Sequence, residues 1–124
     1  MKVKILLKFY FNAASFNERL DKLITYNACK VEGYGFDSVT ALIGDKGKLC
    51  NLKIYLEKRF ESLTKEDIRA LKTYAALRVG IKNLDEKTRR EIKRAVMKFT
   101  RKLTYIHGHK EEIATLSKYR AILN

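Results

Sequence analysis

The sequence contains no proline, no tryptophan and only two cysteines among its 124 residues. Cys29 and Cys50 stand outside any Cys-x-x-Cys motif and have no histidine pair at metal-ligand spacing. We therefore expect two reduced structural thiols, a reducing compartment and no metal site. The longest apolar run, residues 5–11, is interrupted by Lys8 and is much shorter than the roughly 20 residues of a membrane-spanning helix. No apolar core followed by small residues marks a secretory signal, so no membrane partner is predicted.

Catalytic patterns are also missing. None of the serines has a patterned histidine or acid nearby, and the acidic residues are scattered through the starts of predicted helices. His107 and His109 are the two histidines of the chain, and no third metal ligand accompanies them. Histidines near the end of a basic helix are more often helix-terminal cations or RNA contacts. The sequence therefore predicts a protein that is not an enzyme, with no catalytic residue, metal or cofactor.

Positive charge is what the sequence has in excess. The chain has 27 lysines and arginines against 14 acidic residues, a formal net charge of +13. Residues 63–124 hold 16 basic and 7 acidic side chains, so they carry +9 of this charge. A chain of this length, 46% hydrophobic, is expected to form one domain with a modest core. The charge predicts a polyanionic partner for that domain.

The basic residues gather in one predicted helix, which begins at Asn83 or Asp85 and ends near Gly108. Like charges at i,i+4 oppose a helix by a few tenths of a kcal/mol per pair, so a run of one sign favours phosphate binding over a merely solvated face. The apolar stripe of this helix is predicted to be Ile92, Val96, Phe99, Leu103 and Ile106. The predicted RNA-binding cations are Lys87, Arg90, Lys93, Arg94, Lys98, Arg101 and Lys102, with His107, His109 and Lys110 at the helix end.

The other elements follow from periodicity. Residues 2–11 alternate like a half-buried edge strand, residues 16–27 have helical spacing after Ser15, and a short helix is predicted for residues 37–44. Residues 48–59 alternate like a strand, which GDKG could join to residues 36–43 as a hairpin. Thr64, with Asp67 three residues later, predicts a helix that stops at Gly80, and a short last helix follows residue 110. The expected fold is mainly α with a short N-terminal β strand.

A glycine turn is the second candidate site. Gly33 and Gly35 bracket Tyr34, just after Lys30 and before a predicted helix. Such a turn exposes backbone amides where a phosphate oxygen can sit, although a tight turn without a ligand has the same pattern. Tyr105 and Tyr119 are candidates for stacking on bases, with chance placement as the alternative.

Taken in order, these segments resemble the small-subunit ribosomal protein thirteen family over roughly residues 5–110. The likeness begins with GYGFDSVTALI, in which Tyr34 replaces an aliphatic residue. It continues at the start of the next helix with Leu63, Thr64, Glu66 and Asp67, and at the start of the basic helix with Thr88, Arg89, Arg90 and Glu91. The last two segments are Phe99, Thr100, Arg101, Lys102 and Leu103, and the degraded end Tyr105, His107, Gly108, His109 and Lys110. Two departures are a longer connection at residues 48–62 and a tail with only Lys118 and Arg120 as cations.

The resemblance implies a helix-two-turns-helix domain over residues 1–124. Its parts would be the strand, helix and glycine turn (1–36), the short helix and extended connection (37–62), the two-helix core (63–110) and the last helix (111–124). It implies a structural constituent of the small-subunit head that binds small-subunit rRNA, neighbours ribosomal protein nineteen and helps form an intersubunit bridge with the large subunit. Peptidyl-site tRNA is a further partner in the family, through the arginine-rich tail that is reduced here.

The compartment is predicted from two observations. The resemblance begins almost at Met1, and the wealth of lysine, isoleucine and asparagine is typical of AT-rich codons. Together they favour a protein made inside a mitochondrion, with a plastid or bacterial cytoplasm as alternatives. Two other functions stay open: a free DNA- or RNA-binding module of the helix-hairpin-helix type, and a helical subunit whose basic face meets an acidic protein.

Overall fold

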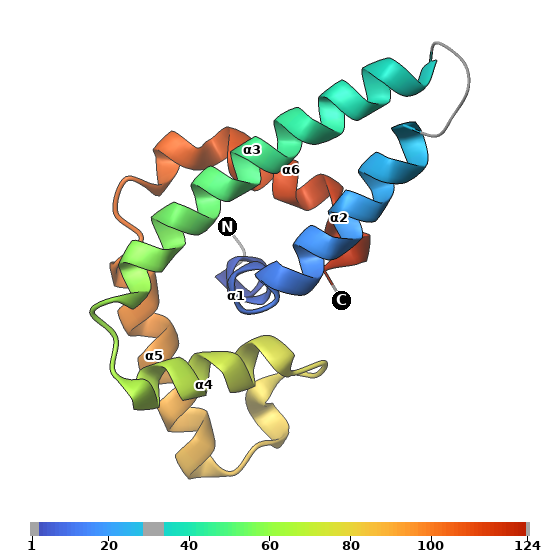
Figure 1. Ribbon diagram of the computed structural model, residues 1–124. Helices are drawn as coiled ribbons and strands as arrows, with labels where there is room; N and C mark the ends of the chain where they lie inside the picture. Colours follow the sequence, from blue (N-terminus) through green and yellow to red (C-terminus); the bar gives the residue numbers. More distant parts are fainter. Residues whose placement is uncertain (1–2, 29–33, 124) are drawn as a thin grey trace. The chain divides into compact units, whose positions relative to one another are not determined.

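The computed structural model describes residues 3–28 and 34–123, and these residues are mainly helical, with no strand among them (Figure 1). The mainly α prediction is therefore confirmed. The elements are α1 (Val3–Phe11), α2 (Ala13–Ala28), α3 (Tyr34–Phe60), α4 (Lys65–Ala76), η1 (Ile81–Asn83), α5 (Glu86–Arg101), η2 (Ile106–His109), α6 (Lys110–Lys118) and η3 (Arg120–Ile122), where η marks short 3₁₀ turns.

The chain divides into two compact units. Unit 1 comprises Met1–Phe11 and Tyr55–Ile106, and unit 2 comprises Asn12–Ile54 and His107–Asn124. The first part of α3 belongs to unit 2, and its last six residues belong to unit 1. Unit 1 thus contains α1, α4 and α5, whereas unit 2 contains α2 and α6. The single RNA-binding domain over residues 1–124 stays a prediction.

Phe60, the last residue of α3, is the centre of an aromatic cluster in unit 1. Its ring stacks on Tyr10 with centroids 4.1 Å apart, meets Phe11 edge-on at 5.4 Å and contacts Phe99 of α5 at 5.1 Å. Pairs of this kind add about 0.5–1.5 kcal/mol each beyond the burial of apolar area. The cluster therefore joins α1, α3 and α5 through one side chain. The other fully buried large side chains of unit 1 include Leu6, Leu7, Phe9, Leu56, Leu71 and Ile92.

Helix α4 begins with the capping box that the sequence predicts. The Asp67 N–H donates to Thr64 Oγ1 at 3.1 Å, and the Thr64 N–H donates to Asp67 Oδ2 at 3.3 Å. Asp67 is only 8% exposed and also accepts from Lys98 Nζ at 3.2 Å, so the start of α4 is tied to α5. Burial by itself raises the pKa of Asp67, but the hydrogen bonds from Lys98 and Thr64 outweigh it and hold the pKa below its ordinary value.

The predicted N-terminal strand is wrong, because residues 3–11 form α1. A half-buried strand puts neighbouring side chains on opposite faces, whereas Leu6 and Leu7 are both fully buried. Lys4 and Lys8 lie four residues apart, which places them on one side of a helix. The Lys4 ammonium donates to the Leu77 carbonyl at 2.5 Å, at the end of α4. The run contains so many apolar residues that it fits both periods, and packing against α4 selects the helix.

The predicted strand at residues 48–59 and the GDKG hairpin are also wrong, whereas residues 37–44 are helical as predicted but belong to a longer helix that does not end at Gly44. The residues of these predictions, 36–59, all lie within the single helix α3. Leu49, Leu52 and Leu56 are buried at spacings of three and four, whereas Cys50 and Ile54 of the alternating pattern are exposed. Gly44 and Gly47 do not break α3, and both face open space.

Unit 2 is held by contacts between α2, α3 and the C-terminal segment. The ring of Phe16 meets Tyr119 edge-on at 6.4 Å, and the Arg19 guanidinium donates to the Ile122 carbonyl at 2.6 Å. The Tyr119 hydroxyl donates to Asp45 of α3 at 2.5 Å. Burial, together with this bond to a carboxylate, raises the pKa of Tyr119 well above its ordinary value. The predicted helices at residues 16–27 and after residue 110 correspond to α2 and α6.

We expect Asp67→Asn to destabilise the protein by about 1 kcal/mol at pH 7, since the amide loses the charge that binds the half-exposed Lys98 ammonium. The folded-state pKa of Asp67 is lowered, so the contribution of the carboxylate is present above its unfolded-state pKa and is lost as the pH falls through the folded-state pKa. The difference from wild type should therefore shrink below about pH 4. Urea unfolding followed by circular dichroism at pH 7 and pH 3 measures it. Glu66→Gln, an exposed acid in the same turn, is the control, and an equal loss in both variants would contradict the assignment.

We expect Gly44→Ala combined with Gly47→Ala to stabilise the protein by about 1–2 kcal/mol, because alanine is the better helix former and a Cβ meets no atom within 4 Å at either position. Thermal and urea unfolding measure the change. Gly80→Ala is the control, since Gly80 lies outside the helices in extended backbone. Destabilisation by the double variant would indicate a turn at these glycines instead of helix.

Candidate nucleic-acid interface

Local side-chain signals fix the start and the end of α5. Asp85 is its N-cap, and the carboxylate accepts from the Thr88 N–H at 3.1 Å. Hydrogen bonding by Thr88, through its side chain and its backbone, lowers the pKa of Asp85. The helix ends at Arg101 and not near Gly108 as predicted, because Lys102 is the C-cap and the Thr104 carbonyl accepts a hydrogen bond from Tyr55 Oη at 2.6 Å. These contacts take the chain out of the helical path.

Burial of one side of α5 determines which side faces solvent. Ile92, Ala95 and Phe99 are buried, and Leu103 is buried just after the helix. The predicted apolar stripe is thus confirmed at Ile92, Phe99 and Leu103. Val96 and Ile106 are only half-buried, and Ala95 takes a buried position that was not predicted. An alanine at this place allows α5 to lie close to its neighbour.

The exposed side of α5 carries a set of cations that we call the cationic face: Lys87, Arg90, Lys93, Arg94 and Arg101. At 100° per residue the five side chains fall within an arc of about 120°, and at 1.5 Å per residue they extend along about 21 Å of helix. Met97 is 53% exposed and falls within the same arc. The arrangement is a narrow strip of positive charge with one apolar side chain, Met97, and one acid, Glu86, within the same arc.

Two predicted cations have protein partners. Lys98 pairs with Asp67, and Arg90 pairs with Glu86 across one turn at 2.5 Å, in a bond that is exposed on both sides. Among the residues that the structure describes, no acid pairs with Lys93, Arg94 or Arg101. These three side chains therefore keep their charge unneutralised. Lys102 is half-buried at the helix end.

The charge of the molecule is concentrated in the unit that contains α5. Unit 1 holds 18 basic and 7 acidic residues, a net charge of +11, whereas unit 2 has 9 basic and 7 acidic residues, or +2. The N-terminal lysines of α1 contribute to unit 1 although they are distant from α5 in sequence. Most of the positive electrostatic field of the molecule thus comes from unit 1.

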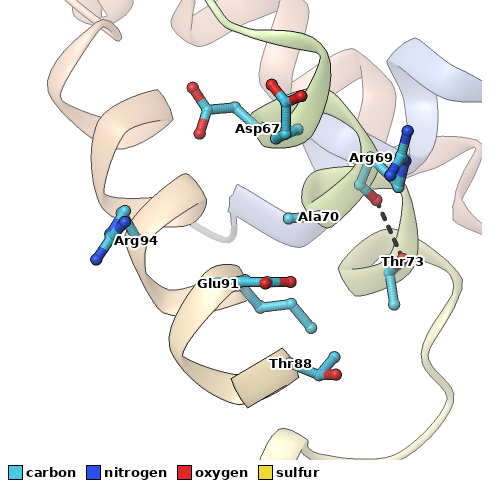
Figure 2. A pocket seen from close by; sticks show the side chains of 9 residues that line it. Asp67, Arg69, Ala70, Thr73, Thr88, Glu91 and Arg94 are labelled. Carbon is cyan, nitrogen blue, oxygen red and sulfur yellow. Dashed lines mark hydrogen bonds between the residues drawn. The ribbon is translucent and has the colours of Figure 1, made fainter.

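A cleft of about 500 Å³ lies between α4 and α5, and its charge is mixed (Figure 2). Glu66, Asp67 and Glu91 line it together with Arg69 and Arg94. Figure 2 shows that Glu91 extends from α5 towards α4, whereas Arg94 extends away from α4. The acids make the cleft a poor site for phosphate. The cationic face outside it is the better candidate.

The remaining predicted site residues belong to unit 2. Lys30 and Gly33 lie outside the described residues, so the turn that Gly33 would open is not seen, while Tyr34 and Gly35 belong to the first turn of α3. His107 is exposed in η2, and Lys110 is the exposed first residue of α6. His109 is the N-cap of α6, with Nδ1 3.6 Å from Glu112 Oε1. The prediction that these residues bind RNA stays a prediction.

Two features of unit 1 are not predicted from the sequence. Arg59 stacks its guanidinium on the Tyr55 ring, with the carbon 4.4 Å from the ring centroid, and no described acid pairs with it. A second row of exposed cations, Lys65, Arg69 and Lys72, runs along α4. The spacing of four and three residues in that row is a signal for a common helix face. The stacking of Arg59 on Tyr55 depends on their spacing of four residues in a helix, whereas the sequence pattern predicts a strand there.

No protein-family model, curated protein or solved structure matches this chain. In the ranges 3–28 and 34–123, no three histidine, cysteine or acidic side chains gather as a metal site. The same ranges contain no helix long and apolar enough to cross a membrane. The arrangement of side chains in unit 1 therefore carries the functional argument.

We expect Lys93→Ala, Arg94→Ala and Arg101→Ala together to lower the slope of log affinity for RNA against log salt by about 2, since each lost phosphate contact removes about 0.7–0.9 of slope. Fluorescence anisotropy over a salt series measures it. The matched control is Lys22→Ala, Lys48→Ala and Arg120→Ala, which removes the same charge from exposed positions of unit 2. Equal slopes for the two triple variants would rule out the cationic face as the site.

Proposed function

We propose that this protein is a nucleic-acid-binding protein that holds RNA phosphates on the cationic face of α5. The observation that carries the proposal is the strip of exposed cations in which Lys93, Arg94 and Arg101 have no described acid partner. An ordinary solvated helix reduces like-charge repulsion with interleaved acids, and α5 instead pairs one of its face residues, Arg90, with Glu86. Phosphates would supply the missing negative charge.

The resemblance to the small-subunit ribosomal protein thirteen family gives this proposal its specific form. In that form the protein is a structural constituent of the small-subunit head, with small-subunit rRNA, ribosomal protein nineteen and a large-subunit bridge partner as neighbours. Two features support it: the capping box of Thr64 and Asp67 lies at the start of a helix, and Asp85 starts the basic helix that packs against it. A place in the mitochondrial ribosome, with a plastid or bacterial one as alternative, and a contact with peptidyl-site tRNA belong to the same proposal.

A free nucleic-acid-binding module is the second candidate, and a specific observation favours it. The strand expected at the N-terminus of the ribosomal family is helix α1 here, and the segment after Gly35 is one long helix in place of a short helix and a loop. Two of the elements that the resemblance implies thus have a different structure. The cationic face is common to both candidates. A helical subunit whose basic face meets an acidic protein is the third alternative.

Sucrose-gradient sedimentation of a tagged copy from the native source separates the two candidates. A ribosomal protein is expected to migrate with the small subunit and to stay there through a moderate-salt wash, because many contacts hold it at once. Replacement of Arg90, Arg94 and Arg101 by glutamate is expected to shift most of the protein to the free fraction at unchanged helix content. Glutamate at Lys22, Lys48 and Arg120 is the control with equal charge.

The outcomes are distinct. Wild-type protein found only in the free fraction would reject the ribosomal form and leave the free module. Normal incorporation of the variant at Arg90, Arg94 and Arg101 would reject the cationic face as the RNA contact, whichever particle the protein joins.

A further inference from the structure

Tyr105 is the most exposed large apolar or aromatic side chain of the part of the chain that the structure describes. It follows α5 in the last turn of unit 1, and 85% of its surface is open to solvent. A tyrosine usually buries its ring, because the ring contributes a large apolar area. A ring left open beside a cationic helix has the form of a surface on which a planar ligand can stack.

The backbone of Tyr105 is strained. Its φ is 61°, and among the described residues other than glycine it alone has a positive φ. A side chain with a Cβ is disfavoured in this left-handed region, where glycine is the ordinary choice. Strain of this kind persists when the surroundings impose it, and it concentrates at binding sites.

Two hydrogen bonds hold the peptide that precedes Tyr105. The Thr104 carbonyl, which belongs to the same peptide unit as the Tyr105 N–H, accepts from Tyr55 Oη at 2.6 Å and from Arg59 Nη2 at 3.4 Å. Tyr55 is itself buried, so one anchor comes from the interior of unit 1. The ring of Tyr105 is thus attached to a fixed peptide instead of a free loop. A ligand that stacks on the ring therefore does not have to order this peptide.

Positive charge lies close to the same turn. Arg101 and Lys102 stand four and three residues before Tyr105 in the sequence, and Arg59 donates to the Thr104 carbonyl. The guanidinium of Arg59 lies on the Tyr55 ring, and no described acceptor reaches its Nε. An exposed ring that is close in the sequence to Arg101 and Lys102, on a peptide that Arg59 contacts, combines the two groups that bind single-stranded nucleic acid: a stacking surface for the base and charge for the phosphates.

Tyr26 is the other exposed tyrosine among the side chains that the structure describes. Tyr26 is 64% exposed but belongs to α2 in unit 2, where the net charge is only +2. Tyr119, the other sequence candidate for stacking, is used within unit 2, since its ring meets Phe16 and its hydroxyl bonds to Asp45. The structure thus separates two tyrosines that the sequence could not distinguish.

We propose that Tyr105 is a stacking platform for an unpaired base of a single-stranded nucleic acid, with Arg101, Lys102 and Arg59 holding the adjoining phosphates. The inference rests on the proposed function and deepens it, because it specifies single strands as the preferred ligand at this end of the cationic face. Bases within a duplex are already stacked on one another and cannot cover the ring.

Tyr105→Gly tests the proposal, because glycine removes the ring and relieves the positive φ together. We expect the variant to be at least as stable as wild type in urea and to bind a labelled uridine oligomer about 5- to 100-fold more weakly. Affinity for an RNA duplex of the same length should change less than about twofold. Tyr105→Phe should bind as wild type, and Tyr26→Ala, which removes the exposed ring of unit 2, should also leave binding unchanged. A deoxythymidine oligomer repeats the measurement for DNA.

Tyr105→Trp gives an independent reading, because it introduces the first tryptophan of the chain. Its fluorescence should be quenched by the uridine oligomer and not by the duplex. Unchanged oligomer affinity of Tyr105→Gly, with weakened binding by the alanine triple variant of the cationic face, overturns the platform and leaves the proposed function standing. Equal loss for oligomer and duplex also overturns it. Failure of wild type to bind either RNA overturns both proposals.

Discussion

The contact between Phe60 and Phe99 is the constraint on which the candidate interface depends. Phe60 brings α1, the end of α3 and α5 together, since its ring also contacts Tyr10 and Phe11. Because Phe99 faces this ring, the rotation of α5 about its own axis is set, and the arc that carries Arg94 and Arg101 is left on the solvent side. The position of the cations is thus determined by a contact between two uncharged side chains, Phe60 and Phe99. A change at Phe60 would alter the interface without touching a cation.

Signals that act over one helical turn could be predicted from the sequence, and contacts between distant residues could not. Thr64 and Asp67 predict their own capping box, and Asp85 predicts the start of α5, because donor and acceptor are three residues apart. The pairing of Lys98 with Asp67 joins residues 31 positions apart, so nothing in the basic run distinguishes this lysine from its neighbours. One predicted phosphate contact is therefore an ion pair within unit 1. Lys93 has no described acid partner, and only the fold shows this difference from Lys98.

The two wrong strand predictions, at residues 2–11 and 48–59, have a common physical origin. Where nearly every residue is apolar, as at residues 3–11, the pattern satisfies both a period of 2 and a period of 3.6, and local spacing cannot choose. In α3 the same ambiguity arises because the spacing of Leu52 and Leu56 fits both the strand and the helix period. Ile54 lies between them in the alternating pattern and was therefore expected to be buried, but it is exposed. Gly44 and Gly47 added a false turn signal, although glycine in a helix is only disfavoured and not excluded. Tertiary packing decides such segments.

Repulsion within α5 relates the stability of the free protein to its binding. Lys87, Arg90 and Arg94 follow one another at spacings of three and four, and like charges at such spacings cost a few tenths of a kcal/mol per pair. Burial of Ile92 and Phe99 stabilises the helix in spite of this cost, since each such side chain contributes about 1.5–3 kcal/mol. A polyanion bound as proposed would remove the repulsion, so part of the binding free energy would be relief of a cost present in the free helix. Salt would then act in opposite directions: it screens the repulsion and favours the free helix, while it would weaken the complex by reducing the gain from counterion release.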